Sequence, residues 1–239
     1  MNLALPFTYK EFVLLHPLSI EGICKEIYQD NRNSIKIKKE ELAIKNLTKI
    51  MKTVIKISHK QGFHAMSLRD LSRESELSMG ALYNYFSSKE EFLNMMYIQG
   101  QALINKIMQE SIRAGQNSSE RLLRGICTHL YLSESISKIF YFFYMEAKSL
   151  KPEDQKKAIT MEQFTENVFE ELLKDGIQNG EFEIPYPLLT ASAIKALLQD
   201  WYLKRYKYSE RKISVEEYAN FLIRFVYQNI ENTNSKELK

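Results

Sequence analysis

Apolar residues recur at helical spacing along most of this 239-residue chain. The clearest case predicts a helix from about Glu40 to Gln61 that ends at Gly62, a residue type that commonly follows the end of a helix. One face of this helix is apolar, with Leu47, Ile50, Met51, Val54, Ile55 and Ser58. The opposite face carries a lysine stripe, defined as Lys45, Lys49, Lys52, Lys56 and Lys60. This stripe is either an ordinary solvated face or a surface that meets phosphates.

Two short helices are expected next. Ser67 and Asp70 stand at the spacing of a capping box and predict a helix that ends near Glu74. After a turn, Ser78 is expected to cap a second short helix that continues through Phe86. Two short helices joined by a tight turn have the geometry of a helix-turn-helix, although any compact helical hairpin has the same spacing.

The rest of the chain also has helical patterns, so the expected fold class is all-α. Further helices are predicted at about Ser87–Ile112, Glu120–Leu132, Ser135–Leu150, Pro152–Gln178, Leu188–Tyr206 and Val215–Glu231, with shorter ones within residues 1–30. The expected organisation is an N-terminal extension (1–40), a helix-turn-helix DNA-binding domain (41–93), an effector-binding and dimerisation domain (94–231) and a tail (232–239).

Composition narrows the class of protein. Eight Gly and five Pro are too few for a disordered, collagen-like or turn-rich β chain. Cys24 and Cys127 form neither a disulfide framework nor a metal set, which suits a reducing compartment. Met1–Leu18 lacks the features of a signal peptide, and the most apolar run, Ile136–Met145, is too short to span a bilayer. We therefore expect a cytoplasmic protein with no membrane partner.

Charge is distributed unevenly. Residues 31–91 contain twelve Lys/Arg and seven Asp/Glu, a net charge of +5 in a chain whose total is +3, so the remainder sums to −2. On the second short helix Gly80 and Asn84 point outward, flanked by Ala81 and Tyr83. Such small residues let the backbone approach base edges in a groove about 12 Å wide, and a tyrosine hydroxyl can reach a phosphate. A positive, flat surface of this kind favours DNA as a partner.

The residues of this region form a recognisable pattern. It reads Gly62-Phe-His-Ala-Met-Ser-Leu-Arg-Asp-Leu-Ser, then Leu77-Ser-Met-Gly-Ala-Leu-Tyr-Asn-Tyr-Phe, then Ser88-Lys-Glu-Glu-Phe-Leu. Residues 50–93 thereby resemble the N-terminal DNA-binding domain of the TetR/AcrR family of bacterial transcriptional repressors. The resemblance covers roughly a fifth of the chain; elsewhere the likeness is only an all-helical pattern of suitable length.

The resemblance implies a set of DNA contacts, and the sequence departs from the family pattern at two places. The implied contacts are Ser67 and Arg69 (backbone and base), Ser78, Met79, Gly80 and Ala81 (start of the recognition helix), Asn84 (polar readout), and Tyr83, Tyr85 and Lys89 (phosphates). Residues 79–81 lack the Arg, Asn or Gln that makes bidentate base contacts. Glu76 stands where the family usually has Gly, so a left-handed conformation there costs about 1 kcal/mol. The extension before Glu40 is absent from most members.

The family also dimerises and binds small effectors, which the resemblance extends to this chain as a homodimer on a palindromic double-stranded operator. The expected interface comprises Ala191, Ile194, Leu198, Tyr218, Leu222 and Phe225, although the same stripes suit an intramolecular core. The expected effector pocket comprises Phe140, Phe143, Tyr144, Met161, Phe164 and Trp201, or else these residues are core. Its aromatic character favours an apolar or acyl-type ligand of unknown identity, with Arg124, His129 and Lys148 as possible anchors for an acid.

Catalytic chemistry has no support in the sequence. The chain contains no GxGxxG, P-loop, HExxH or CxxC pattern, and His16, His59, His64 and His129 are scattered. We expect no enzyme, no cofactor and no metal site. The expected function is a dimeric, ligand-responsive transcriptional regulator, a repressor rather than an activator. The rivals are a non-specific DNA-associating protein and a helical lipid-binding or enzymatic module with a vestigial DNA-binding head.

Overall fold

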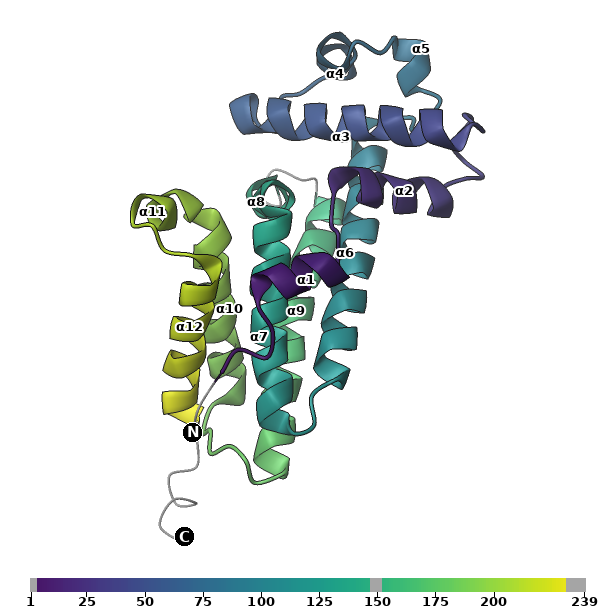
Figure 1. Cartoon of the computed structure of the whole chain (residues 1–239). Helices are drawn as coiled ribbons and strands as arrows, with labels where there is room; N and C mark the ends of the chain where they lie inside the picture. Colours follow the sequence, from purple (N-terminus) through teal and green to yellow (C-terminus); the bar gives the residue numbers. More distant parts are fainter. Residues whose placement is uncertain (1–3, 147–151, 231–239) are drawn as a thin grey trace, which may run out of the picture. The chain divides into compact units, whose positions relative to one another are not determined.

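The computed structural model describes residues 4–146 and 152–230, and the regular structure within them consists of helices without strands (Figure 1). The all-α expectation is confirmed. The helices are α1 (Tyr9–Leu15), α2 (Ile20–Asp30), α3 (Glu40–Gln61), α4 (Leu68–Ser75), α5 (Met79–Leu82), α6 (Lys89–Arg113), α7 (Ser118–Ser135), α8 (Ser137–Glu146), α9 (Pro152–Gln178), α10 (Pro187–Leu203), α11 (Arg205–Glu210) and α12 (Val215–Ile230).

The chain divides into two compact units. The head unit contains the described residues of Pro17–Leu103 and Ile136–Ile159. The body unit contains those of Met1–His16, Ile104–Ser135 and Thr160–Lys239. Helices α2 to α5 and α8 therefore belong to the head unit, and α7 and α10 to α12 belong to the body unit. The tail predicted at 232–239 lies outside the described residues.

Helix α3 is the scaffold of the head unit. Its predicted apolar face is buried at Leu47, Ile50, Met51, Val54 and Ser58, whereas Ile55 is only half-buried and Ile57 is buried instead. The helix ends at Gly62, whose φ of 79° lies in the left-handed region that glycine tolerates. Helix α2, from the N-terminal extension, packs on α3 through Ile23, Cys24, Ile27 and Tyr28.

The second helix of the helix-turn-helix is shorter than the sequence predicts. Ser78 caps it as expected, but α5 ends at Leu82 rather than Phe86. Tyr85 and Phe86 are both buried, and the Tyr85 hydroxyl accepts a hydrogen bond from the Asn46 amide on α3. The backbone therefore leaves the helix in a turn, and the carbonyl of Asn84 accepts a hydrogen bond from the N–H of Lys36 instead of from a helical partner.

The body unit is built around α7, with α10 and α12 packed against it. The predicted helix 188–206 is broken at Lys204, and the short α11 follows. The break lets the ring of Tyr208 pack at 4.9 Å from that of Trp201, while Asp200 accepts hydrogen bonds from Lys204 and Tyr208. Helices α7 and α8 also differ in extent from the predicted 120–132 and 135–150, and residues 147–150 lie outside the described residues.

Candidate nucleic-acid interface

Helices α4 and α5 form the predicted helix-turn-helix on α3. The capping box at the start of α4 is present, because Ser67 Oγ accepts from the N–H of Asp70 and the Asp70 carboxylate accepts from the N–H of Ser67. Ser72 donates its hydroxyl to the carbonyl of Leu77 at 2.6 Å and so holds the turn, while the small side chain of Ser75 is fully buried. Leu71 and Leu82 fix the two helices to the core.

Most of the predicted DNA-contacting residues lie on the open side of this motif. Ser67, Arg69, Ser78 and Gly80 are exposed, and Met79, Ala81 and Asn84 are half-buried. Tyr83 is 46% exposed at the end of α5. Ser67 and Ser78 use their hydroxyl oxygens as helix caps, accepting from the N–H groups of Asp70 and Ala81. The hydroxyl and the N–H of Ser67 also donate to the Asp70 carboxylate, at 2.7 and 3.1 Å, so Ser67 is engaged within the motif. The motif therefore presents a small, mostly uncharged surface with Arg69 beside it.

Gly80 has no explanation within the fold. Its φ is outside the left-handed range, and a Cβ placed on it meets only Ser78 Oγ at 4.0 Å. An exposed glycine inside a helix costs about 1 kcal/mol relative to alanine. By contrast, a Cβ on Gly176 would clash with Phe182 at 1.9 Å, so that glycine has a packing reason. A glycine on the open face of α5 is therefore suited to the close approach of something outside the chain.

Two of the predicted phosphate contacts have other roles in the structure. Tyr85 is 2% exposed and its hydroxyl accepts a hydrogen bond from the Asn46 amide at 2.9 Å. Lys89 donates its ammonium to the carbonyls of Phe63, His64 and Met66 at 2.6–3.0 Å. Both side chains thus bind the head unit together, and we leave them out of the proposed DNA-contacting surface.

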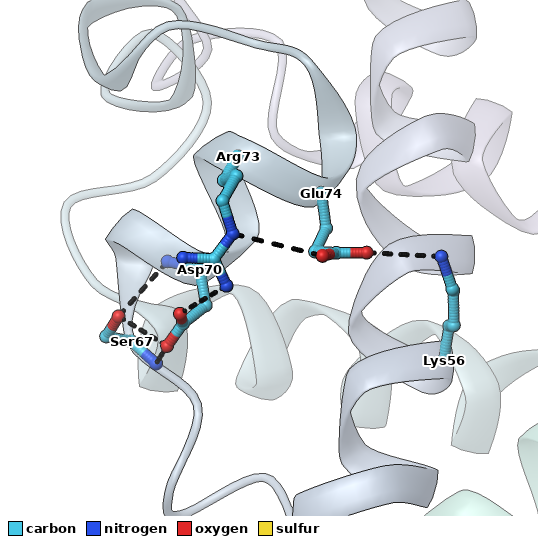
Figure 2. A network of polar contacts seen from close by, with 5 residues as sticks. All are labelled: Lys56, Ser67, Asp70, Arg73 and Glu74. Atoms are coloured by element: carbon cyan, nitrogen blue, oxygen red, sulfur yellow. Dashed lines mark hydrogen bonds and ion pairs between the residues drawn. The ribbon is translucent and has the colours of Figure 1, made fainter.

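Ion pairs balance the acids of α4. Figure 2 shows Arg73 between Asp70 and Glu74, and Lys56 of α3 bonded to Glu74 at 3.1 Å. The hydrogen bond from Ser67 lowers the pKa of Asp70, and the one from Lys56 lowers the pKa of Glu74, so both carboxylates stay ionised. Paired in this way, the acids of α4 repel a polyanion less than free carboxylates do.

The turn residue Glu76 adopts the left-handed conformation that the family resemblance implies, with φ 53° and ψ 30°. Its carboxylate pairs with Lys49 at 2.7 Å, and that hydrogen bond lowers the pKa of Glu76. Two members of the lysine stripe, Lys49 and Lys56, are therefore paired with acids. The stripe residues Lys45, Lys52 and Lys60 are exposed.

The predicted effector-pocket residues are divided between the two units. Phe140 and Phe143 are buried in the head unit, where the Phe143 ring stacks on Tyr97 at 4.4 Å, and Tyr144 is half-buried. Phe164 is half-buried in the body unit. The side chain of Met161 lies outside what is described.

Trp201 is fully buried in the body unit. Its ring packs against Tyr208 and Tyr218, and its Nε1 donates to Glu134 at 3.0 Å. This indole is thereby enclosed by neighbours of its own unit, and its part in a pocket remains a prediction.

Two of the three side chains predicted to anchor an acidic ligand have neighbours that the structure describes. Arg124 pairs with Glu120 at 2.9 Å, and Lys148 lies outside the described residues. His129 is buried, 3.3 Å from the ammonium of Lys195, and burial holds the pKa of this imidazole well below its usual value. The body unit therefore holds a buried pair of basic side chains.

The predicted dimer residues prove to be mostly core. Ala191, Ile194, Leu198, Tyr218 and Leu222 are buried inside the body unit, so only Phe225, 47% exposed, is available to a partner. The sequence misleads because α10 and α12 are apolar on more than one side. Their open sides carry an apolar face that shares Phe225 with the predicted set and adds Leu189, Ala193, Ala196 and Phe221.

Within the described ranges, no group of His, Cys, Asp and Glu side chains is placed to hold a metal ion. None of the helices described there combines the length and apolarity needed to cross a membrane. The exposed helix-turn-helix on an all-α chain instead defines a DNA-binding protein of the helix-turn-helix class.

The chain belongs to the TetR family of bacterial transcriptional regulators. The family described as "Bacterial regulatory proteins, tetR family" matches residues 50–96, and that described as "Tetracyclin repressor-like, C-terminal domain" matches residues 115–226. Together these matches span both the helix-turn-helix and most of the helices after it. The resemblance read from the sequence is thus confirmed, and no enzymatic family is found.

Three similar proteins illustrate the relationship. The fatty acid metabolism regulator protein of Bacillus subtilis (strain 168) is 21% identical over 134 residues, covering 56% of this chain and 69% of that protein. A solved tetR-family regulatory protein from Rhodococcus RHA1 superposes with a TM-score of 0.65 at 21% identity, covering 76% and 97% of the two chains. The transcriptional regulator FadR from Bacillus subtilis, solved with stearoyl-CoA, gives a TM-score of 0.63 at 18% identity, covering 77% and 98%.

Proposed function

We propose that this regulator is a homodimeric repressor that binds a palindromic operator by inserting α5 of each subunit into the major groove. Gly80 carries the proposal, because the fold itself gives no reason for a glycine there. Around it, Ser78, Met79 and Ala81 face the base edges, and Met79 suits the methyl group of thymine. Tyr83 contacts a phosphate beside the groove, while Arg69 and Asn84 supply polar contacts.

Dimerisation through α10 and α12 supplies the second copy of the motif. The proposed interface is the exposed apolar face of Leu189, Ala193, Ala196, Phe221 and Phe225. The alanines on α10 allow two helices to approach closely, and Phe221 and Phe225 stack with ring centroids 6.0 Å apart. Two such helix pairs form a four-helix interface and bury apolar surface that is otherwise open to water.

The proposed effector is an acyl-type molecule that releases the operator. The support is the similarity to a fatty acid metabolism regulator and to a regulator solved with stearoyl-CoA. Within the head unit, the aromatic residues Phe140, Phe143 and Tyr144 are the proposed apolar lining. A ligand that binds one conformation of the dimer more tightly shifts the population toward the state with lower DNA affinity.

The deciding experiment is selection of duplexes from a random pool by the full chain, followed by competition binding. We expect an enriched inverted repeat whose complex survives a large excess of random DNA. Addition of long-chain acyl-CoA is expected to release that complex, with free CoA as the control. Placing the selected duplex across a promoter then tests repression in a purified transcription reaction.

Non-specific DNA association is the second candidate function. Residues Met79–Ala81 lack the side chains that make bidentate base contacts, and Lys45, Lys52 and Lys60 are exposed on α3. If DNA association is non-specific, the selection enriches no sequence, and the affinity for every duplex falls by the same factor as the salt concentration rises.

A further inference from the structure

The segment between α2 and α3 is strongly basic. We define this basic arm as Asn31–Lys39; its charged residues are Arg32, Lys36, Lys38 and Lys39, and it contains no acid. It belongs to the N-terminal extension, outside the stretch 50–96 that matches the family's DNA-binding region. Nothing in the helix-turn-helix itself accounts for its charge.

The arm is held in a fixed shape. Ile35 is fully buried, and the hydroxyl of Tyr28 on α2 donates to the carbonyl of Lys38 at 3.1 Å. The ammonium of Lys38 donates to the carbonyls of Arg32 and Ile35 at 2.8 and 2.9 Å, which closes the loop on itself. The hydrogen bonds of Lys38 thus fix the backbone of the arm. Arg32, Lys36 and Lys39 project from this fixed backbone.

The arm is joined directly to the recognition helix. The backbone N–H of Lys36 donates to the carbonyl of Asn84, just beyond α5, at 2.9 Å. Asn84 immediately follows the exposed Tyr83, so the arm adjoins the end of the surface proposed to contact DNA. In Figure 1 the loop between α2 and α3 lies at the same end of α3 as α5.

Unlike two lysines of α3 that are paired with carboxylates, the remaining cations of the arm have no acidic partner among the described residues. Arg32, Lys36 and Lys39 are exposed, and none is in an ion pair or side-chain hydrogen bond with any residue that the structure describes. Lys49 and Lys56, in contrast, are paired with Glu76 and Glu74. Three unneutralised cations on a fixed backbone beside a DNA-reading helix favour a polyanion at that position.

We propose that the basic arm is a second DNA-contacting surface, in which Arg32, Lys36 and Lys39 bind phosphates flanking the base pairs that α5 reads. This inference rests on the proposed function, because α5 sets the position of the arm on the duplex. The arm adds affinity without sequence information, since phosphates are the same along the duplex. It therefore compensates for the few base contacts available to Met79–Ala81.

The test compares the parent with the triple variant Arg32→Ala/Lys36→Ala/Lys39→Ala, which keeps Lys38. The matched control is Lys10→Ala/Lys106→Ala/Arg113→Ala, which removes the same charge from exposed positions of the body unit. The probe is the duplex selected by the parent from a random pool, extended by about one helical turn on each side. Binding is titrated over a series of salt concentrations, and thermal unfolding of each variant checks the fold.

We expect the arm variant to bind at least about tenfold more weakly near physiological salt. Its slope of log affinity against log salt is expected to fall by up to about 2.7 per subunit, at 0.9 for each lost phosphate contact. Preference for the selected duplex over random DNA should be retained. An arm variant with the parent's affinity and salt slope overturns the proposal, as does a control variant that loses as much.

Failure of the arm is distinguishable from failure of the proposed function. If the parent selects a duplex and the arm variant binds it like the control, only the arm proposal fails. If the parent selects no sequence, the proposed function fails, and the same salt titration on a random duplex of equal length still decides whether the arm binds phosphates. An arm variant that unfolds at lower temperature is replaced by Arg32→Gln/Lys36→Gln/Lys39→Gln, which keeps the long side chains without their charge.

Discussion

The carboxylate of Glu146, at the end of α8, accepts a hydrogen bond from the backbone N–H of Phe63 at 2.9 Å. Phe63 lies in the turn between α3 and α4, so this bond fastens α8 to the base of the helix-turn-helix within the head unit. The rings of Phe63 and Phe142 also meet edge to face at 6.3 Å. Because the carboxylate is buried, its pKa is raised above the ordinary value of 4.5.

The raised pKa predicts a specific pH dependence of stability. Between 4.5 and the raised pKa, the folded chain holds more protons than the unfolded chain, so the contribution of Glu146 to the free energy of unfolding falls as pH rises. Glu146→Gln keeps an acceptor for Phe63 N–H without a charge, and is expected to remove this part of the pH dependence. Glu146→Ala leaves that N–H unsatisfied, at a cost of about 1–3 kcal/mol. Denaturant unfolding at several pH values checks both, and equal pH profiles for parent and Glu146→Gln contradict the account.

Two neighbouring tyrosines are expected to respond oppositely to loss of their hydroxyls. Tyr83→Phe removes a proposed phosphate contact and should weaken binding about tenfold for every duplex, with stability unchanged. Tyr85→Phe removes the bond with Asn46 and should lower the free energy of unfolding by about 1 kcal/mol while leaving DNA affinity unchanged. Equal operator affinity of Tyr83→Phe and parent rules out the phosphate role. Fluorescence anisotropy and thermal unfolding together measure both effects.

Backbone strain at Glu76 can be isolated with two substitutions. Glu76→Gly relieves the left-handed conformation, and Glu76→Ala keeps it while losing the same pair with Lys49. We expect the glycine variant to be more stable than the alanine variant by about 1 kcal/mol. Both variants remove a negative charge from the turn before α5, so both should bind DNA more tightly at low salt. Equal stability of the two variants contradicts the assignment of strain.

The dimer face predicts a change of assembly. Phe221→Glu and Phe225→Glu place charges on the exposed face of α12 and should convert the proposed dimer into monomers, because burying an unpaired carboxylate in an interface is costly. The control is Ile98→Glu, an exposed apolar residue of the head unit. Sedimentation measures the assembly; a dimer that survives both phenylalanine substitutions excludes this face.

Local patterns along the sequence predicted much of the fold. The features that they did not predict depend on contacts between residues far apart in the chain. The capping pair of Ser67 and Asp70 depends on neighbours within a few residues, so the sequence revealed it, and the family resemblance indicated the left-handed Glu76. The early end of α5 depends on burying Tyr85 and on the distant N–H of Lys36. Likewise the role of Lys89 depends on three carbonyls more than twenty residues away. Such long-range partners leave no periodic pattern.

The dimer face shows the same limit. Periodicity identified apolar stripes on the last helices, but Leu198 and Leu222 face the core while Phe221 faces outward. Only the packing of α10 and α12 on α7 decides which stripe is left open. The family resemblance, by contrast, rested on a contiguous string of residues and was confirmed.

The most direct test of the central claim is the size of residue 80. Gly80→Ala and Gly80→Leu fit the fold, since a Cβ there meets only Ser78 Oγ at 4.0 Å, and both should match or exceed the parent's stability. If α5 lies in the major groove, the leucine side chain holds the backbone away from the bases, and affinity for the selected duplex should fall at least about a hundredfold, a loss of about 2.7 kcal/mol. A folded Gly80→Leu variant that binds this duplex as tightly as the parent contradicts the account.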